Sequence, residues 1–314
     1  DPEMSRGLGD VYKRQIPAFL VMIFYVIMYA LNMSTVPMLT MIAMNYINEG
    51  TYVNFGLARG IGSASWATSA LIFGQVVSFL GANILSIAYC VFALVTLFIL
   101  YHLPESKITK TKTEEVQEEG SVVTVIKKYK IFFFLLLGFC FMFSGATAIG
   151  TYLINIVKSL GGNTSLYGVA MFAMAFSELP VMMTVPKLMK KFNSVTLILV
   201  ASIFYICRNY TIGLAPNLIV LIIGMMFQGL SYGLFTGVIT YYVTYNLDTQ
   251  DQMSGQTMIG IMTSGIGSTL GNVLGGILQD TIGLNALFTF VYLMTALGAV
   301  IIFICKFVSL KVKK

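Results

Sequence analysis

The chain has 314 residues, of which 57% are hydrophobic and 10% are charged, and its mean hydropathy is +0.84. A soluble domain carries roughly a quarter charged residues, so this composition excludes an ordinary soluble protein and predicts a polytopic membrane protein. The net charge of +6 does not indicate a nucleic-acid partner, because the lysines cluster in short loops and tails. The four cysteines lie within apolar runs without pairing or metal-ligand spacing, so we expect them to be reduced.

Apolar spans follow one another from residue 16 onwards, and each is long enough to cross roughly 30 Å of hydrocarbon. They cover residues 16–46, 57–80, 82–103, 129–157, 166–186, 194–213, 216–246, 254–279 and 283–308. We therefore expect an all-α membrane protein with nine transmembrane helices. Pro37 is expected to break the first span and Pro180 the fifth.

The polar segments divide the chain into four parts. Residues 1–15 resemble translated sequencing-adapter sequence, and we expect this tail to be non-native. Residues 16–103 hold three spans, and residues 129–314 hold six. Between them, residues 104–128 mix Lys, Thr and Glu, a composition typical of a flexible linker. A six-plus-six helical protein that lacks its first three helices would have this organisation.

The basic residues predict the orientation in the membrane. They lie in the linker, in the loop after the fifth span and in the C-terminal tail, which all fall on one side by the parity of the spans. They include Lys107, Lys110, Lys112, Lys127, Lys128, Lys187, Lys190, Lys191, Lys311, Lys313 and Lys314. Lys158 is the basic residue of the opposite loops. We therefore expect the C-terminus and the linker to be cytoplasmic.

One face of the second span carries an unusual set of residues. Arg59, Ser63 and Trp66 follow one another at helical spacing, and Trp66 is the only tryptophan of the chain. An intramembrane cation is costly unless it faces a partner or a wet cavity. A guanidinium beside an indole suits a polyhydroxylated ring, because it offers forked donors and an apolar plate. The alternative is an interfacial arginine that reaches the headgroups, with Trp66 as ordinary packing.

Glu178 and Arg208 are further charges well inside the spans. A buried carboxylate without a partner takes up a proton rather than staying charged. Glu178 therefore pairs with an arginine, binds solute hydroxyls or carries a proton; a Glu178–Arg208 pair that merely joins two helices is the structural alternative. The polar neighbours expected to line the same cavity are Tyr152, Asn155, Gln228, Ser231 and Tyr232.

Three glycines of the eighth span repeat every four residues, at positions 267, 271 and 275. Small residues at this spacing let two membrane helices approach closely. We expect Gly267, Gly271 and Gly275 to serve packing rather than binding.

With these residues in view, the chain from Ile16 to its C-terminus resembles the major facilitator superfamily, in particular the lactose-permease-like sugar:cation symporters. The most specific match is Phe-Gly-Leu-Ala-Arg-Gly-Ile-Gly-Ser-Ala-Ser-Trp, residues 55–66, which looks like the start of helix 5 of that family. The resemblance implies that Arg59 contacts sugar hydroxyls, that Ser63 lines the site and that Trp66 stacks on the sugar ring. Ser-Glu-Leu-Pro looks like the helix 8 motif, which gives Glu178 a role in sugar binding and coupling, and Arg208 falls at an arginine that modulates proton release. The nine spans would be helices 4 to 12 of twelve.

The departures from that family concern the coupling residues. Its helix 4 carboxylate falls near Thr40, and its helix 10 histidine and glutamate fall at Gln228 and Ser231. None of these side chains titrates in the physiological range. If protons drive transport, Glu178 is the expected carrier, while sodium coupling and facilitated diffusion stay open.

The sequence thus predicts a secondary active transporter of the major facilitator superfamily, working by alternating access on a sugar or another small polyhydroxylated solute. Its expected partners are that solute, H+ or Na+ as coupling ion and the lipid bilayer, and we expect a monomer. No enzyme chemistry is expected, and no metal or cofactor, since His102 has no metal-ligand partner. The alternatives are a nucleoside or drug carrier of the same superfamily and a membrane receptor or scaffold without transport.

Overall fold

The computed structural model describes residues 18–312 apart from residues 52, 82 and 105–120. This part of the chain is helical throughout and contains no strand, which confirms the predicted all-α fold. The predicted non-native tail, residues 1–15, lies outside the described residues, as does most of the predicted linker. The helices that precede the linker are α2 (Ala18–Asn48), α3 (Phe55–Leu80) and α4 (Asn83–Tyr101).

The remaining helices form one bundle in which four of the six spans are single long helices. These are α7 (Lys130–Ser159), α8 (Thr164–Lys191), α9 (Ser194–Gly213) and α14 (Leu284–Val312), preceded by the short helix α6 (Val122–Lys128). The other two spans are interrupted by π-helical turns. The first consists of α10 (Leu218–Met226), η1 (Gly229–Gly233) and α11 (Leu234–Asn246); the second consists of η2 (Thr249–Asp251), α12 (Gln252–Gly260), η3 (Ile261–Gly267) and α13 (Ser268–Thr281).

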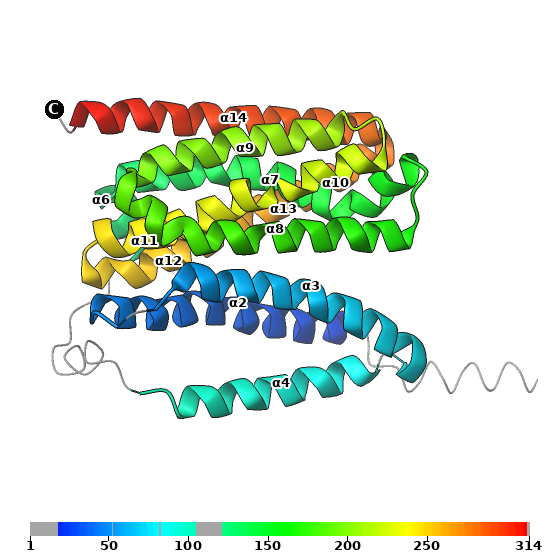
Figure 1. Ribbon diagram of the computed structural model, residues 1–314, viewed down its shortest axis with the longest axis horizontal. Coiled ribbons are helices and arrows are strands. Elements are labelled where there is room, and N and C mark those ends of the chain that lie inside the picture. The colour runs from blue at the N-terminus through cyan, green and yellow to red at the C-terminus, as the bar shows by residue number, and fades with distance from the viewer. Residues whose placement is uncertain (1–17, 52, 82, 105–120, 313–314) are drawn as a thin grey trace, which may run out of the picture.

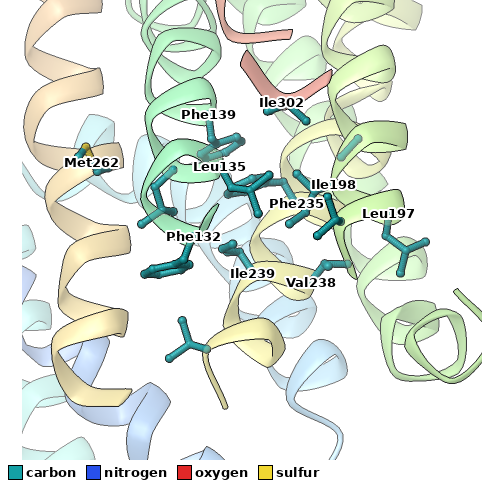
Figure 2. Close-up of a cluster of buried hydrophobic side chains, with 14 of the residues drawn as sticks. Phe132, Leu135, Phe139, Leu197, Ile198, Phe235, Val238, Ile239, Met262 and Ile302 are labelled. Atoms are coloured by element: carbon teal, nitrogen blue, oxygen red, sulfur yellow. The ribbon is translucent and has the colours of Figure 1, made fainter. Parts of the chain in front are cut away.

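The main hydrophobic core lies where α7, α9, α11 and α14 meet. Phe139 of α7 stacks on Phe235 of α11 with ring planes 4° apart, and Ile302 of α14 lies beside them, fully buried (Figure 2). Close to this core, the lysine-bearing ends of α7, α8 and α14 come together with the start of α9. We call this the basic end of the bundle; it holds Lys128, Lys187, Lys190 and Lys191 and the end of α14.

Helices α2 and α3 join the bundle beside α8, α11 and α12, and α4 lies beyond them (Figure 1). Contact is closest along α3 and α8, because α3 has glycines there. A Cβ at Gly56 would collide with the carbonyl of Met182, and one at Gly60 would lie 3.0 Å from the Cα of Leu179. By contrast, α4 buries no residue. An apolar helix with all its faces exposed is expected where lipid is the solvent.

Eight helical segments of the described chain are long and apolar enough to cross a membrane. They correspond to eight of the nine predicted spans, and the second predicted span forms the helix α3 (Phe55–Leu80). The protein is therefore a multi-pass membrane protein.

The expected breaks at Pro37 and Pro180 were wrong. Both prolines lie within continuous helices, α2 and α8, and the interruptions fall instead at η1 and η3. Glycine explains the position of η1: Gly229 approaches the backbone of Ser177 so closely that a Cβ would collide with it, and its N–H donates to Ser177 Oγ at 3.1 Å. The helix widens where it gains this contact, and π-turns of this kind are frequent at functional sites.

The glycine repeat of the eighth span packs against α7, as predicted. A Cβ at Gly267 would lie 3.1 Å from the carbonyl of Cys140, and one at Gly275 would lie 3.0 Å from Cβ of Ala148. Between them, a Cβ at Gly271 would collide with the carbonyl of Ser144. The absence of side chains therefore sets the distance between α13 and α7.

Replacing Gly271 by Ala should lower the melting temperature of the detergent-solubilised protein, because overpacking a close helix contact costs about 1–3 kcal/mol. The matched control is Gly260→Ala, since a Cβ at Gly260 meets open space within a helix. That change should be neutral or stabilise by up to about 1 kcal/mol. Equal melting temperatures for the two variants would contradict the packing role.

Candidate functional site

A cavity of about 900 Å³ lies between α3 and the C-terminal bundle, near the middle of the spans. The polar and aromatic residues that line it come from α2, α3, α7, α8, α9 and the interrupted seventh span. They are Thr40, Phe55, Arg59, Ser63, Trp66, Phe143, Thr147, Glu178, Arg208, Gln228 and Tyr232. Of the eight residues predicted to bind solute or to couple transport, six line this cavity together with Tyr232 of the seventh span, and the two on α7 do not.

Glu178 is the centre of the hydrogen-bond network in this cavity. It is 5% exposed, and Ser63 Oγ of α3 donates to its Oε2 at 2.5 Å. Gln228 Nε2 donates to the other carboxylate oxygen, Oε1, at 3.2 Å. The carboxyl group is therefore held from both sides, by α3 and by the span that leads into η1. Gly233 of η1 lies directly against this side chain, since a Cβ there would be in van der Waals contact with it at 3.6 Å.

Arg208 lines the cavity without pairing with Glu178. Its side chain is 1% exposed, and Nη1 donates to Oδ1 of Asn209 at 3.0 Å. Asn209 is fixed in turn, because its Nδ2 donates to Thr295 Oγ1 of α14 at 2.7 Å. The Nε of Arg208 has no hydrogen-bond partner within the described structure, and neither arginine of the cavity forms an ion pair with Glu178 there. The arrangement therefore differs from a simple Glu178–Arg208 pair between two helices.

Arg59 points into the cavity rather than towards the headgroups. Its Nη2 donates to the hydroxyl of Tyr232 at 3.3 Å, across the gap between α3 and η1. Trp66 lies two turns further along the same face of α3 and is 55% exposed. The guanidinium, the indole and the Glu178 carboxylate therefore border one space, with donors, an apolar plate and acceptors.

The structure places Tyr152, Asn155 and Ser231 elsewhere. The Tyr152 hydroxyl donates to the backbone carbonyl of Asn272 at 3.1 Å, and neither it nor Asn155 lines the cavity. Ser231 is fully buried and donates to the carbonyl of Phe227 at 2.9 Å. The α7 residue that does line the cavity is Thr147, which the sequence analysis did not select. Its position near the middle of α7 was the available signal, since Tyr152 and Asn155 lie further towards one end.

A second polar cluster, also not foreseen, lies at the basic end. Lys128 Nζ of α6 lies 2.6 Å from Asp248 Oδ2 and 2.7 Å from Asp251 Oδ2. The Tyr129 hydroxyl donates to Asp251 Oδ2 at 3.0 Å and accepts the backbone N–H of Asp248, also at 3.0 Å. The cluster therefore ties the end of the linker to the turn between α11 and α12.

Mutual hydrogen bonding shifts the protonation equilibria in this cluster. The hydrogen bonds to Asp248 and Asp251 raise the pKa of Lys128, and the hydrogen bond from Lys128 lowers the pKa of Asp248. Burial raises the pKa of the Tyr129 phenol. The ion pair between Lys128 and Asp248 therefore stays formed over the whole range between mildly acid and mildly alkaline pH.

The comparisons with known proteins agree with this fold. The sequence model of the MFS_1 like family matches residues 12–290. The chain belongs to the MFS_1 like family. This confirms the predicted membership of the major facilitator superfamily, and the fold is that of its transporters.

More distant likenesses point the same way. The chain is 22% identical over 283 residues to the maltose permease of Geobacillus stearothermophilus, covering 90% of this chain and 71% of that one. It matches a variant of the E. coli fucose:proton symporter FucP with a TM-score of 0.56 at 17% identity, over 80% of this chain and 68% of that one. FucP in an outward conformation matches with a TM-score of 0.54 at 15% identity, over 80% and 67% of the two chains.

Replacing Asp251 by Asn should lower the free energy of unfolding by about 1–3 kcal/mol, because a carboxylate that is 1% exposed then loses its charge-assisted bonds. The measurement is the melting temperature in detergent, with the exposed Asp280→Asn as control. A melting temperature unchanged from the wild type would refute the role of the cluster.

The same cluster is tested a second time by the pH dependence of the melting temperature of Asp248→Asn. The pKa of Asp248 is lowered from its ordinary value of 3.8 in the folded protein. Its contribution to the free energy of unfolding is therefore complete above pH 3.8 and is lost only as the pH falls through the lowered pKa. Since the pKa of Lys128 is raised from 10.5, its ammonium group stays protonated throughout the neutral range. The difference in melting temperature from the wild type should thus stay constant between about pH 5 and 9.

Proposed function

We propose that this protein is a secondary transporter that moves a sugar or another small polyhydroxylated solute across the cell membrane by alternating access. The observation that carries the proposal is the central cavity, in which Arg59, Ser63 and Trp66 of α3 face Glu178 across the space between two groups of helices. A site between two helical units is accessible from either side when the units rock against each other. The names of the maltose permease and of FucP support a sugar as the solute.

The side chains of the central cavity contact different parts of the solute, according to their chemistry. The Arg59 guanidinium offers forked donors to sugar oxygens, and the Glu178 carboxylate accepts from sugar hydroxyls in place of Ser63 or Gln228. The exposed Trp66 ring provides a flat apolar surface for the C–H face of a pyranose. We assign Arg208 and Gln228 to the opposite wall, where the guanidinium has a free donor at Nε.

The domain organisation follows from the same proposal. Helices α2, α3 and α4 belong to the N-terminal helical half, and α7 to α14 form the C-terminal half, with the linker of residues 104–128 between them. The basic end, with the end of α14, faces the cytoplasm, in keeping with the positive-inside rule.

Glu178 is our candidate for the coupling group. It is the only carboxylate among the described residues that line the central cavity, and it is hydrogen-bonded to both helical halves. A proton taken up here would weaken the bond to Gln228 or Ser63 and so change how α3 is held against α8. In this proposal H+ is the coupling ion, with Na+ as the alternative, and Arg208 modulates the carboxylate through its charge.

Arg59→Ala should weaken sugar binding about tenfold or more, since a lost charge-assisted hydrogen bond costs roughly 1.5–3 kcal/mol. Trp66 is the only tryptophan, so its fluorescence reports binding directly during titration with maltose, fucose, lactose and glucose. The control variant is Lys158→Ala, which removes an exposed cation at the far end of α7. Equal affinities in the wild type and Arg59→Ala would refute the site.

If no sugar of the panel changes Trp66 fluorescence or is taken up, the solute class is wrong. Nucleosides and drug-like cations are then tested in the same assay. Absence of uptake for all of them, together with a specific binding response, would favour a receptor over a transporter.

Glu178→Gln should keep sugar exchange between loaded and empty liposomes but abolish accumulation driven by a pH gradient. The amide oxygen still accepts from Ser63, and its NH2 group can donate to Gln228 Oε1 once the Gln228 amide turns over, so both contacts are kept while the titratable group is lost. Both rates are measured on the same reconstituted variant, and exchange serves as the internal control. Retained accumulation driven by the pH gradient would show that another group carries the proton.

A further inference from the structure

A second cavity, of about 500 Å³, lies beside the central cavity, between α2, α11, α12 and η3. Along α11 it extends towards the basic end as far as Thr240, and along α2 it extends in the opposite direction as far as Tyr29. The two cavities share Val36, Thr40, Arg59 and Tyr232. The hydrogen bond between Arg59 and Tyr232 therefore lies at the boundary between them. None of the uses assigned to the central cavity requires this second space.

The polar groups that line the second cavity are mainly hydrogen-bond acceptors. Thr236 Oγ1 donates its proton to the carbonyl of Tyr232 at 2.9 Å, and Thr240 Oγ1 donates to that of Thr236 at 2.8 Å. Gln256 Nε2 donates to the carbonyl of Thr240 at 3.2 Å, which leaves its Oε1 as an acceptor. Each hydroxyl has a single proton, so both threonines present only lone pairs to a molecule in the cavity.

These acceptors are buried, which restricts the kind of molecule that can bind to them. Thr236, Thr240 and Gln256 are 5%, 6% and 6% exposed. The described lining contains no carboxylate and does contain the Arg59 guanidinium, so the cavity disfavours a cation. A neutral molecule rich in O–H donors satisfies buried acceptors without bringing a charge. The lining therefore fits the solute class proposed for the central site.

Thr236, Thr240 and Gln256 belong to a row of polar side chains on α11 and α12, which we call the polar stripe and which continues to the basic end. Thr244 follows Thr240 by one turn of α11, and Gln252 precedes Gln256 by one turn of α12. Gln252 Nε2 donates to the carbonyl of Thr244 at 3.0 Å, repeating the contact made one turn away. Thr244 and Gln252 line a third cavity, of about 730 Å³, together with Asn48 and Asp248. Along the seventh span, the residues that line the three cavities thus follow one another from Gln228 to Leu247, towards the basic end.

We propose that the second cavity is a further binding site for the transported solute, occupied between the central cavity and the basic end, in which Thr236, Thr240 and Gln256 accept hydrogen bonds from its hydroxyl groups. The solute reaches it when the Arg59–Tyr232 hydrogen bond opens. The inference rests on the proposed function, since it gives the same solute a second position.

The experiment compares Thr240→Val with Thr240→Ser in purified protein reconstituted into liposomes, with radiolabelled maltose as probe, or fucose if only fucose is taken up. Val keeps the shape of Thr and removes the acceptor, whereas Ser retains it. Uptake by Thr240→Val should be about three- to tenfold slower, the effect of one neutral hydrogen bond, while Thr240→Ser stays near the wild type. Affinity at the central site, read from Trp66 fluorescence, should be unchanged in both variants.

The control is Thr289→Val, because Thr289 is exposed on α14 and its hydroxyl makes the same backbone contact, to the carbonyl of Asn285 at 2.9 Å. This variant should behave as the wild type. If Thr240→Val is unstable in a melting experiment, Gln256→Met tests the same site from α12 and should give the same split between uptake and affinity.

The alternative outcomes separate the two proposals. Uptake by Thr240→Val and Gln256→Met equal to that of the wild type would overturn the second binding site and leave the central site intact. Slower uptake that Thr240→Ser does not restore would assign the stripe to helix packing and likewise overturn it. A wild-type protein that neither binds nor takes up either sugar would reject the function on which the inference rests.

Discussion

A carboxylate in the middle of a membrane protein must find partners, and the fold around Glu178 is arranged to supply them. Water is scarce at this depth, and an unpaired charge there costs several kcal/mol. Ser63 of α3 and Gln228 of the C-terminal bundle each donate to one of its oxygens. Both carboxylate oxygens therefore have a hydrogen-bond partner, and the carboxylate connects the two groups of helices. Any change in the separation of α3 from the bundle alters one of these bonds. The carboxylate therefore links the state of the site to the positions of the helices.

Small residues let α3 and η1 approach α8 closely enough for both hydrogen bonds to Glu178 to form. Gly56 and Gly60 let α3 approach α8, and Gly229 lets the start of η1 approach the backbone of Ser177, next to Glu178. A side chain at Gly56 or Gly229 would push a helix away, and the hydrogen bonds to the carboxylate would lengthen beyond their useful range. In a bilayer, where the hydrophobic effect does not drive helices together, such close contacts also supply much of the association energy.

The length of the apolar runs was sufficient to predict the helices. Helical spacing predicted the shared face of Arg59, Ser63 and Trp66, because side chains three and four apart on a helix lie on the same side. It did not identify the partners. Ser63, rather than Arg208, meets Glu178, and this depends on how far α3 slides along α8. Tyr152 and Asn155 are as polar as Thr147, but only depth and rotation within the bundle decide which residue meets the cavity.

The interruptions of the helices show the same limit. Proline is a strong local signal, yet α2 and α8 continue through it, whereas η1 and η3 arise where glycines allow a helix to widen towards its neighbour. Likewise, Asp248 and Asp251 look like ordinary loop residues in the sequence. Their contact with Lys128 joins residues that are 120 and 123 positions apart, a pairing that only the assembled bundle determines.

The contacts between α2, α3 and the bundle differ between their two ends, and this bears on how a solute moves through the cavities. Met44 and Phe55 are buried near the basic end, and the Phe55 ring meets Tyr241 of α11 edge to face at 6.0 Å. Trp66, further along α3, is half exposed. Passage to the basic end requires both the Arg59–Tyr232 bond and the Phe55–Tyr241 contact to open, and these lie on the same face of the bundle. Under the proposed alternating access, a rocking motion of α2 and α3 away from the bundle would separate both contacts, and the polar residues of α11 and α12 would become accessible in the same step that releases Glu178 from Ser63.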